Sequence, residues 1–488
     1  MLPGSDGKRI SEMKPEIKRA VQKVDIKRWK KVHLEFGEGF LELSVPPDCV
    51  VLSMKDVPVL ADPLSSIEAA LSRPIGGPSI EDIIREKPQP ASRVTVAVAV
   101  SDITRPVPYK GETGILLPLL KRLADAGVQK PNITLVVGTG THRPSAPAEK
   151  MEMFGESVVR EYRLLDHDCG DSGCMTYMGK TRKQTDVYVN TAFFSADVRI
   201  VTGLVESHFM AGVSGGRKAV CPALVDWRTI EKFHGPDFLE SPCADNLILD
   251  GNPCHEEAVD VAKTIGVDFA VNVTLDKDMR LTGVFAGDLE ASHTEAFRFM
   301  KAYTAIPLDR DFDIVLTHGG YSGRNHYQTA KAGCSAVPAV KSGGTVIIAA
   351  DNRDQEPIGS TVYRDLSGRL KALGVDGYIK MITDPAWSFT KDQWEPEVWG
   401  RVLRKVGETG LVYCSPQIPP GEFSRLPGRS GHEFIEESEA LSGREAARAM
   451  VQNALLYFFS RRLKKSGPPS TAVIREGPYG VPYRRKAS

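Results

Sequence analysis

Three short polar segments carry side chains that can move protons or bind anions. They are SDITRP at 101–106, GTGTHRP at 138–144 and ESHFMAGVSGGRK at 206–218, and each follows an apolar run that predicts a buried strand. Imidazoles exchange protons near neutral pH, whereas arginine and lysine bind carboxylates and phosphates. These residue types favour acid–base chemistry on a small anionic molecule.

The third segment ends in a glycine-rich bend: Ser214, Gly215, Gly216, Arg217 and Lys218. A parallel strand that ends in such a bend before a helix exposes backbone N–H groups, which can hold a phosphate. An ordinary strand-to-helix turn with a solvent-exposed lysine explains the bend on its own equally well, and the dinucleotide and Walker spacings are absent. Three such loops together predict one ligand site at the carboxyl edge of a parallel sheet.

Strands and helices alternate along the chain, which predicts an α/β fold with mainly parallel, doubly wound sheets. A second α/β pattern begins after a helix at 289–303, so we expect two α/β domains. The expected parts are an extension at 1–35, an N-terminal domain at 36–303, a C-terminal domain at 304–440, a helix at 441–465 that packs on the domains, and a flexible tail at 466–488.

Composition excludes several partner classes. The 488 residues carry no net charge, which gives no electrostatic reason for nucleic acid or anionic membrane as a partner. No apolar run is long enough to span a membrane and the first residues lack an apolar signal core, so we expect a cytoplasmic protein. The eight cysteines contain no CxxC pair, and reduced thiols are expected.

The segments SDITRP, GTGTHRP, ESHFMAGVSGGRK and NHYQTAK, in this order, resemble the nickel-dependent lactate racemase family of 2-hydroxyacid racemases and epimerases. The similarity extends from about residue 40 to 420. The resemblance implies an isomerase whose cofactor is pyridinium-3,5-bisthiocarboxylic acid mononucleotide, the nickel-pincer nucleotide, which holds nickel through sulfur, carbon and sulfur. It also implies a small 2-hydroxy acid substrate, and cofactor-synthesis and nickel-insertion enzymes as partners.

The resemblance assigns roles residue by residue. It implies that His142 and His208 are the catalytic pair and that His234 ligates nickel. The cofactor would contact Asp102, Thr104, Arg105, Ser214, Gly215, Gly216 and Lys218, with a covalent link to Lys218 as one form. Substrate-binding candidates are Arg105, Tyr327, Gln328, Lys331 and Trp387. Because these last residues and the cofactor residues come from different domains, we expect the active site in the interdomain cleft.

The chemistry explains why two histidines are needed. Hydride removal from C2 of a 2-hydroxy acid is easier when the hydroxyl loses its proton at the same time, and an imidazole can take that proton. The product is a planar 2-keto acid, and opposite enantiomers place the hydroxyl on opposite sides. The remaining histidines are interpreted as packing or surface residues, with His318 as a candidate to line the cleft: His167, His255, His293, His326 and His432.

The sequence allows three alternative functions. The same cofactor chemistry can act on a larger or more polar acid, such as a sugar acid or malate. A nicotinamide-dependent dehydrogenase also moves a hydride from a 2-hydroxy acid, but its dinucleotide fingerprint is absent. A non-catalytic cofactor-binding protein would not need the pair His142 and His208. The sequence leaves the oligomeric state open.

Overall fold

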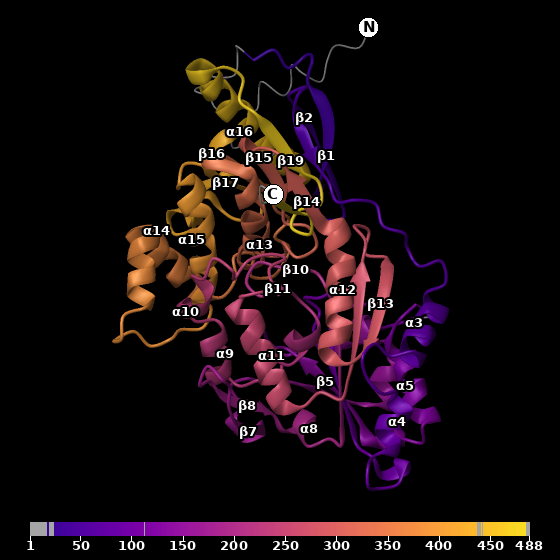
Figure 1. Cartoon of the computed structure of the whole chain (residues 1–488). Helices are drawn as coiled ribbons and strands as arrows, with labels where there is room; N and C mark the ends of the chain where they lie inside the picture. Colours follow the sequence, from indigo (N-terminus) through magenta and orange to yellow (C-terminus); the bar gives the residue numbers. More distant parts are fainter. Residues whose placement is uncertain (1–16, 19–23, 112, 437–440, 442, 485–488) are drawn as a thin grey trace. The chain divides into compact units, whose positions relative to one another are not determined.

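The computed structural model describes residues 17–18, 24–111, 113–436, 441 and 443–484 (Figure 1). The chain divides into two compact units, which are described separately. Unit 2 is continuous and comprises residues 56–303, whereas unit 1 combines residues 1–55 with 304–488. The first twenty residues of the expected N-terminal domain, 36–55, therefore belong to unit 1.

Unit 2 is built on a six-stranded sheet with the order β13-β12-β9-β4-β5-β6. All neighbours are parallel except β12 and β13, which form an antiparallel pair. The central strand β4 has the sequence VAVAVS and is buried on both faces, as expected of a parallel strand covered by helices. The strands are β4 (Val96–Ser101), β5 (Ile133–Gly138), β6 (Arg163–Asp166), β9 (Val198–Leu204), β12 (Phe269–Leu275) and β13 (Leu281–Gly287).

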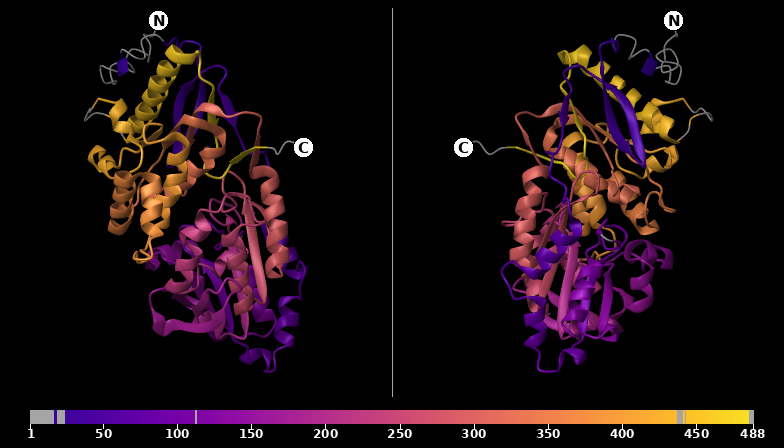
Figure 2. Two further views of the ribbon diagram at one scale, coloured as in Figure 1. Left: turned by 60° about the vertical axis from the view of Figure 1, so that its left-hand side comes forward. Right: turned by 90° about the vertical axis from the view of Figure 1, so that its right-hand side faces the viewer.

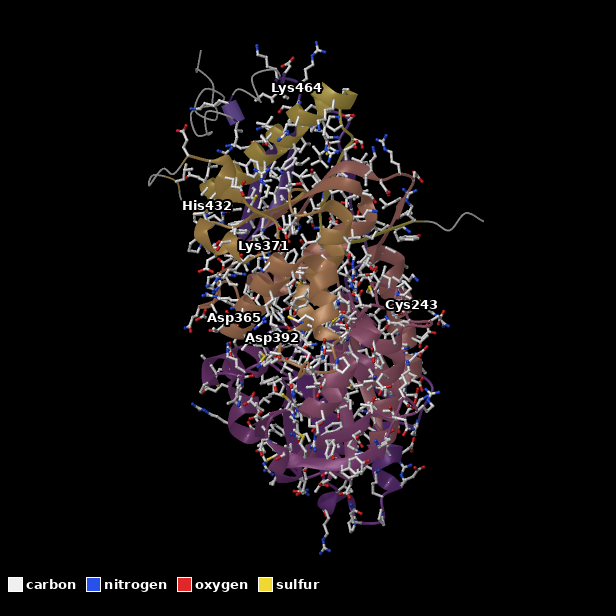
Figure 3. The ribbon with its side chains drawn as sticks, turned by 90° about the vertical axis from the view of Figure 1, so that its left-hand side faces the viewer. Cys243, Asp365, Lys371, Asp392, His432 and Lys464 are labelled. Carbon is white, nitrogen blue, oxygen red and sulfur yellow. The ribbon has the colours of Figure 1, made fainter. Side chains whose placement is uncertain are left out.

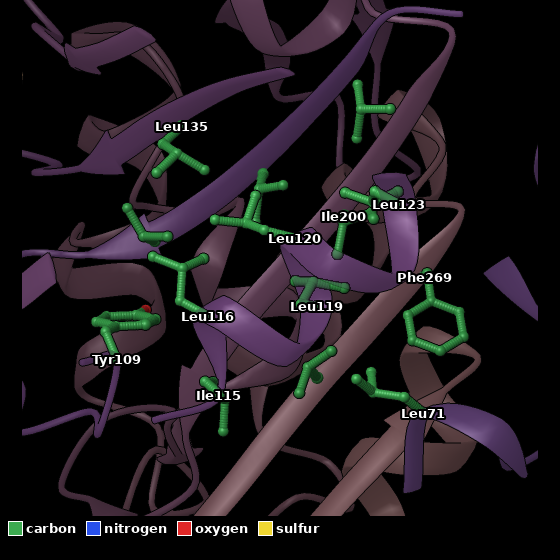
Figure 4. Close-up of a cluster of buried hydrophobic side chains, with 14 of the residues drawn as sticks. Leu71, Tyr109, Ile115, Leu116, Leu119, Leu120, Leu123, Leu135, Ile200 and Phe269 are labelled. Atoms are coloured by element: carbon green, nitrogen blue, oxygen red, sulfur yellow. The ribbon is translucent and has the colours of Figure 1, made fainter. Parts of the chain in front are cut away.

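Helices and two hairpins cover this sheet. Helix α5 buries Leu116, Leu119, Leu120 and Leu123, whose spacing of three and four places them on one face. Figure 4 shows this face packed against side chains of the sheet, including Ile200 and Phe269. The hairpins are β7 (Met175–Lys180) with β8 (Asp186–Asn190), and β10 (Ser207–His208) with β11 (Gly212–Val213). The helices are α3 (Pro63–Ser72), α4 (Ile80–Arg85), α5 (Leu116–Asp125), α6 (Pro147–Phe154), α7 (Glu156–Glu161), α8 (Thr191–Phe194), α9 (Trp227–Phe233), α10 (Pro236–Leu239), α11 (Pro253–Ile265) and α12 (Leu289–Thr304).

Unit 1 contains a second six-stranded sheet, with the order β18-β17-β16-β15-β19-β3, and every neighbouring pair is parallel. A separate parallel pair joins β14 to β20. The strands are β3 (Val50–Leu52), β14 (Ala305–Leu308), β15 (Phe312–His318), β16 (Val340–Ala349), β17 (Leu411–Cys414), β18 (Arg429–Ser430), β19 (Thr471–Ile474) and β20 (Val481–Arg484).

A hairpin of β1 (Lys30–Phe36) and β2 (Gly39–Val45) covers part of unit 1 together with α16 (Gly443–Ser466), as the two views in Figure 2 show. Alternate hairpin residues, such as Leu34 and Leu43, are buried in one cluster with Met450 and Leu455 of α16. The other helices are α13 (His326–Ala336), α14 (Thr361–Ile382) and α15 (Trp394–Val406). The alternation of apolar and polar residues along both strands accounts for this hairpin.

The C-terminal segment differs from its expected form as a flexible tail. Residues Thr471–Ile474 are fully buried and form β19 between β15 and β3. The backbone of an extended, apolar TAVI segment pairs in a sheet despite the prolines and glycines around it. The expected extension at 1–35 also differs, since β1 begins at Lys30, and residues 1–16 and 19–23 lie outside the described part of the chain. Among the described residues, no helix has the length and apolar character of a membrane span.

Candidate active site

The sheet of unit 2 brings the three polar loops together. Strand β4 lies between β9 and β5, so the loops that follow these three strands leave neighbouring positions of the same edge. The chain passes from β4 to β5 on one side and later returns to β9 on the other. The gap between β4 and β9 is therefore a topological switch point, where ligands of open α/β sheets bind.

A tyrosine that the sequence did not single out fixes the loop after β4. Tyr109 accepts a hydrogen bond from the Ser101 amide at 2.7 Å, and its hydroxyl lies 2.8 Å from Thr202 Oγ1 of β9. The Thr202 hydroxyl donates to Ala99 O at 2.8 Å, so Tyr109 is the donor toward it. These contacts tie the loop at 101–109 to two adjacent strands.

Asp102 and His142 form a hydrogen-bonded pair across the first two loops. His142 Nδ1 lies 2.6 Å from Asp102 Oδ2, and the other carboxylate oxygen accepts from the amide and the hydroxyl of Thr104 at 3.1 and 2.6 Å. Burial alone opposes the charge of Asp102, but His142, Thr104 and Arg105 outweigh it and lower its pKa to about 2. The carboxylate is therefore ionised at neutral pH.

An ionised Asp102 fixes the role of each nitrogen of the His142 ring. Nδ1 carries a hydrogen and donates it to the carboxylate, which leaves the lone pair on Nε2. The His142 side chain is 35% exposed, so this nitrogen can be reached by a substrate. Asp102, expected among the cofactor contacts, is here the partner of a candidate base.

His208 is held differently. It lies on the short hairpin of β10 and β11, is buried, and stacks on Phe209 with ring centroids 5.0 Å apart. Its Nδ1 accepts hydrogen bonds from the backbone amides of Met210 and Ala211 at 3.2 and 3.3 Å. Because Nδ1 is an acceptor, the hydrogen of the neutral ring is on Nε2.

The Ser214-Gly215-Gly216 bend is filled by the protein's own side chains. The Ser214 hydroxyl donates to Leu204 O at 2.6 Å, and the Gly216 amide donates to Asn272 Oδ1 at 2.8 Å. A Cβ on Gly216 would lie 2.7 Å from the His293 ring, so glycine is required for this close approach. The expected phosphate site requires backbone amides that are free to bind a ligand. The Gly216 amide already donates to Asn272, so it could bind a phosphate only by giving up this bond.

Lys218 lies in the short helical turn after this bend and is half-buried. Burial, together with the nearby charges of Arg105 and Arg217, lowers the pKa of its amine to about 7. Its Nζ lies 5.3 Å from the centre of the Phe233 ring. A large fraction of this amine is uncharged near neutral pH, and an uncharged amine is a nucleophile.

His234 follows α9, whose C-terminal end it caps. Burial, then the charge of Lys218, lowers the pKa of His234 to about 3, so the ring is neutral. Its Nδ1 lies 3.3 Å from Ile230 O, and a carbonyl can only accept, so Nδ1 carries the hydrogen. The lone pair is then on Nε2, which is the form of imidazole that ligates a metal.

Arg105 provides a fixed cation in the same loop cluster. Its Nε lies 3.6 Å from Glu206 Oε1, and Nη1 donates to Thr104 O at 3.2 Å. Both charged side chains of the pair are 20% exposed. Arg105 can therefore exchange its partial contact with Glu206 for an anionic ligand without leaving the loop.

The substrate candidates of unit 1 gather around α13 and α15. Gln328 and Lys331 are three residues apart on α13 and share one face. Tyr327 accepts a hydrogen bond from Trp394 Nε1 at 2.7 Å, whereas Trp387 Nε1 donates to Gln393 Oε1 at 2.9 Å in the loop before α15.

Glu395 is an additional acidic group in this part of unit 1. Burial raises its pKa to about 8, although Lys331 partly opposes this shift, and the nearby Asp392 adds to it. Asp392, labelled in Figure 3, accepts a hydrogen bond from Ser360 at 2.7 Å. The available signal in the sequence was a pair of glutamates, Glu395 and Glu397, within the short segment WEPEVW, and sequence reasoning missed it.

Six further histidines serve mainly in packing, whereas His33 is exposed on β1. His167, His293, His318 and His326 are all buried and hydrogen-bonded within their own units. His318 Nε2 lies 2.7 Å from Arg475 O, so a residue of the C-terminal segment holds it. His255 and His432 are half-buried.

Comparisons with known proteins agree on one family. Residues 36–245 match the family described as lactate racemase N-terminal domain. The chain is 32% identical to the lactate racemase of Lactiplantibacillus plantarum over 392 residues, which is 79% of this chain and 88% of that protein. It is 29% identical to the lactate racemase of Thermoanaerobacterium thermosaccharolyticum over 348 residues, 69% of this chain and 76% of that protein.

Solved structures share the fold. The lactate racemase apoprotein from Thermoanaerobacterium thermosaccharolyticum superposes with a TM-score of 0.76 and 23% identity, covering 94% of this chain and all of that one. A protein from Thermotoga maritima superposes with a TM-score of 0.61 and 16% identity, covering 88% of this chain and all of that one. At these identities the likeness concerns the architecture alone.

Proposed function

Because the chain belongs to the lactate racemase family and is an isomerase of the racemase type, we propose that it interconverts the enantiomers of a small 2-hydroxy acid with a nickel-pincer nucleotide. The observation that carries this proposal is the pair of Asp102 and His142 beside the loop of Lys218 and the imidazole of His234. Membership of a family of racemases favours an isomerase over the two other classes that the sequence alone left open, a dehydrogenase and a non-catalytic cofactor-binding protein.

The residues present fit the proposed cofactor. His234 is neutral with its lone pair on Nε2, and one imidazole added to sulfur donors is a set that suits nickel. Lys218 offers an amine that is partly uncharged at neutral pH, as a covalent link to a thioacid would need. Arg105 and Lys218 add positive charge for an anionic nucleotide. When bound, the cofactor would accept the C2 hydride and return it.

His142 would act on the substrate hydroxyl. Its Nε2 lone pair can accept the hydroxyl proton, and the Asp102 carboxylate stabilises the imidazolium that forms, because it accepts the hydrogen on Nδ1. The same ring can return the proton in the opposite direction. His208 is proposed to face the hydroxyl of the other enantiomer. In the tautomer with hydrogen on Nε2 it donates a hydrogen bond to that oxygen, and the ring must lose this hydrogen before it can take the hydroxyl proton.

A 2-hydroxy acid also carries a carboxylate, which needs a cation. We assign this role to Arg105 or Lys331, with Gln328, Tyr327 and Trp387 as further substrate contacts. That residues of both units complete one site remains a prediction from the sequence. Lactate is the first candidate substrate, and a larger or more polar acid such as malate or a sugar acid is the alternative.

The test requires protein that carries its cofactor. The chain should be produced in a host that also makes the cofactor-synthesis and nickel-insertion enzymes, and its nickel content measured. Each enantiomer of lactate, malate and a sugar acid is then supplied separately, and the products are separated on a chiral column. We expect racemisation of at least one acid by nickel-loaded protein and none by apoprotein. Nickel-loaded protein that converts none of these acids would contradict the proposal.

A further inference from the structure

Arg217 is buried next to the candidate site but is not a ligand-binding side chain in this structure. It is 1% exposed and forms no ion pair with a carboxylate among the residues that the structure describes. Its Nη2 donates to Ala211 O at 2.8 Å, and its Nη1 faces Gly215 O at 3.3 Å. Two of its nitrogens donate to backbone carbonyls, so the buried guanidinium holds this backbone in place.

His293 holds Arg217 from the neighbouring helix α12. Its Nε2 lies 2.8 Å from Arg217 Nη1, and because a guanidinium can only donate, this nitrogen is the acceptor; the Ser214 carbonyl oxygen lies 2.9 Å from the same nitrogen and receives no hydrogen from it. Burial and the guanidinium lower the pKa of His293 well below its usual value, so the ring is neutral and carries no competing charge. Gly216 lets the ring approach, and Asn272 of β12 binds the Gly216 amide at 2.8 Å. The bend is thus fixed from β12 and α12.

The contact between Arg217 and Ala211 connects this arrangement to His208. The carbonyl of Ala211 accepts a hydrogen bond from Arg217 at 2.8 Å, and the amide of Ala211 donates one to His208 Nδ1 at 3.3 Å. Met210 supplies a second amide to the same nitrogen at 3.2 Å. The orientation of these amides decides which ring nitrogen of His208 carries the hydrogen, because an amide can only donate.

We propose that Arg217, supported by His293, is a positioning residue that holds His208 in the tautomer with hydrogen on Nε2. This inference rests on the proposed function, in which His208 is a catalytic histidine. It means that the two histidines differ in the resting protein. In the resting protein His142 presents a lone pair on Nε2 and can take the hydroxyl proton, whereas His208 presents a hydrogen there and donates a hydrogen bond to the substrate oxygen. For the opposite enantiomer, His208 must first lose this hydrogen.

The tautomer can be measured on apoprotein, without the cofactor. Protein labelled with nitrogen-15 in its ten histidines gives ring nitrogen resonances that distinguish protonated from unprotonated nitrogen, and a His208→Gln variant identifies the signals of His208. We expect hydrogen on Nε2 in the wild type. In Arg217→Lys we expect a mixture of tautomers, because one ammonium group cannot span the carbonyls of Ala211 and Gly215.

Two further comparisons separate positioning from folding. Arg228→Lys is the matched control, since Arg228 is half exposed and pairs with Asp226 at 2.6 Å, and it should leave the His208 signals unchanged. His293→Gln, which keeps an acceptor for Arg217, should preserve the tautomer, whereas His293→Leu should not. If Arg217→Lys does not fold, these two His293 variants decide the question. Wild-type hydrogen on Nδ1, or no change in Arg217→Lys and His293→Leu, would overturn the proposal.

Nickel-loaded protein gives the functional readout. We expect Arg217→Lys to lower kcat by about 10- to 100-fold, the range for partners that orient a reacting group, while its nickel content stays at the wild-type level. Unchanged kcat in a variant with a disturbed tautomer would contradict the proposed positioning role. If the loaded wild type racemises none of the tested acids, the proposed function fails, but the tautomer result in apoprotein still stands or falls on its own.

Discussion

The imidazole of His142 donates from Nδ1 to the buried carboxylate of Asp102 across 2.6 Å. The two residues are forty positions apart in sequence, and they meet because β4 and β5 are adjacent parallel strands whose loops leave the same edge. This pair has a direct consequence for turnover.

Replacement of Asp102 by asparagine should disable His142 as a base. A neutral amide no longer stabilises the imidazolium and can donate toward Nδ1, which would place the hydrogen on Nε2. We expect kcat to fall by roughly 10²- to 10⁴-fold, the usual contribution of a positioned base. The turnover of nickel-loaded protein is measured by separating the product enantiomers on a chiral column. Asp197→Asn is the matched control, because Asp197 accepts a hydrogen bond from the Thr95 amide away from the site. An unchanged kcat would separate Asp102 from the chemistry.

Lys218 should be the most readily acylated lysine of its region in apoprotein. Because its pKa is lowered to about 7, the uncharged amine becomes the main form just above neutral pH, and the rate of acylation should level off there. Peptide mapping by mass spectrometry after brief acylation at several pH values measures this rate. Lys232, which pairs with Asp237 at 3.2 Å, is the comparison. The same pH profile for both lysines would show that the environment of Lys218 does not favour the free amine.

Replacement of His234 by alanine should abolish nickel retention and leave the fold intact. The ring lies at the end of α9, where its Nδ1 is 3.3 Å from Ile230 O, and the backbone of the helix does not depend on this side chain. Nickel per chain, measured on protein from the cofactor-producing host, should fall to background. Circular dichroism should match the wild type, and His255→Ala should keep its nickel. Full nickel content in His234→Ala would exclude this residue as the ligand.

Glu395 should make the stability of the protein depend on pH. Its pKa is raised from 4.5 to about 8 by burial, so between these values the folded state keeps a proton that the unfolded state releases. The free energy of unfolding therefore falls as pH rises through this window, by up to about 1.4 kcal/mol per pH unit.

Glu395→Gln should remove this part of the dependence. Urea unfolding at pH 6 and pH 8 should show that the variant loses less stability than the wild type between the two conditions. Glu422→Gln is the matched control outside this cluster. If the wild type and Glu395→Gln lose the same free energy between pH 6 and pH 8, the carboxyl of Glu395 does not retain its proton.

Removal of the C-terminal segment should unfold unit 1. A chain that ends at Ser466 lacks β19, whose residues Thr471–Ile474 are fully buried between β15 and β3. Without β19, the neighbouring strands β15 and β3 each lose a hydrogen-bonding partner, and their unpaired backbone groups destabilise unit 1. Limited proteolysis should cut the truncated chain within residues 304–466 and spare residues 56–303. A chain that ends at Arg484 is the control, and equal resistance of both chains would contradict the prediction.

The sequence was sufficient to predict the parts of the site that depend on strand ends. SDITRP, GTGTHRP and the segment around His208 each follow a recognisable apolar run, and parallel strands deliver such loops to one edge. The resemblance then supplied roles for residues such as His142 and His234. It did not indicate that Asp102 binds His142, because that contact depends on which strands are neighbours.

Contacts made by distant segments were not predictable from local pattern. His293 and Asn272 contact the bend at 214–216 from elements 56 to 79 residues away, and nothing in their own sequence marks them. The strand β19 was also missed, because a threonine and three apolar residues between prolines and glycines are no stronger a strand signal than an ordinary linker gives. Its assignment depends on β15 and β3, which offer two open edges for it.

The pairing of β19 with β3 has a consequence for the order in which the protein folds. Unit 2 is one continuous stretch, residues 56–303, so all its strands are synthesised well before β19 at Thr471–Ile474. Unit 1 needs Val50–Leu52 from the beginning of the chain and Thr471–Ile474 from its end in the same sheet. During translation, β3 must therefore wait for almost the entire polypeptide, and the unit that carries His142 and Lys218 can form first.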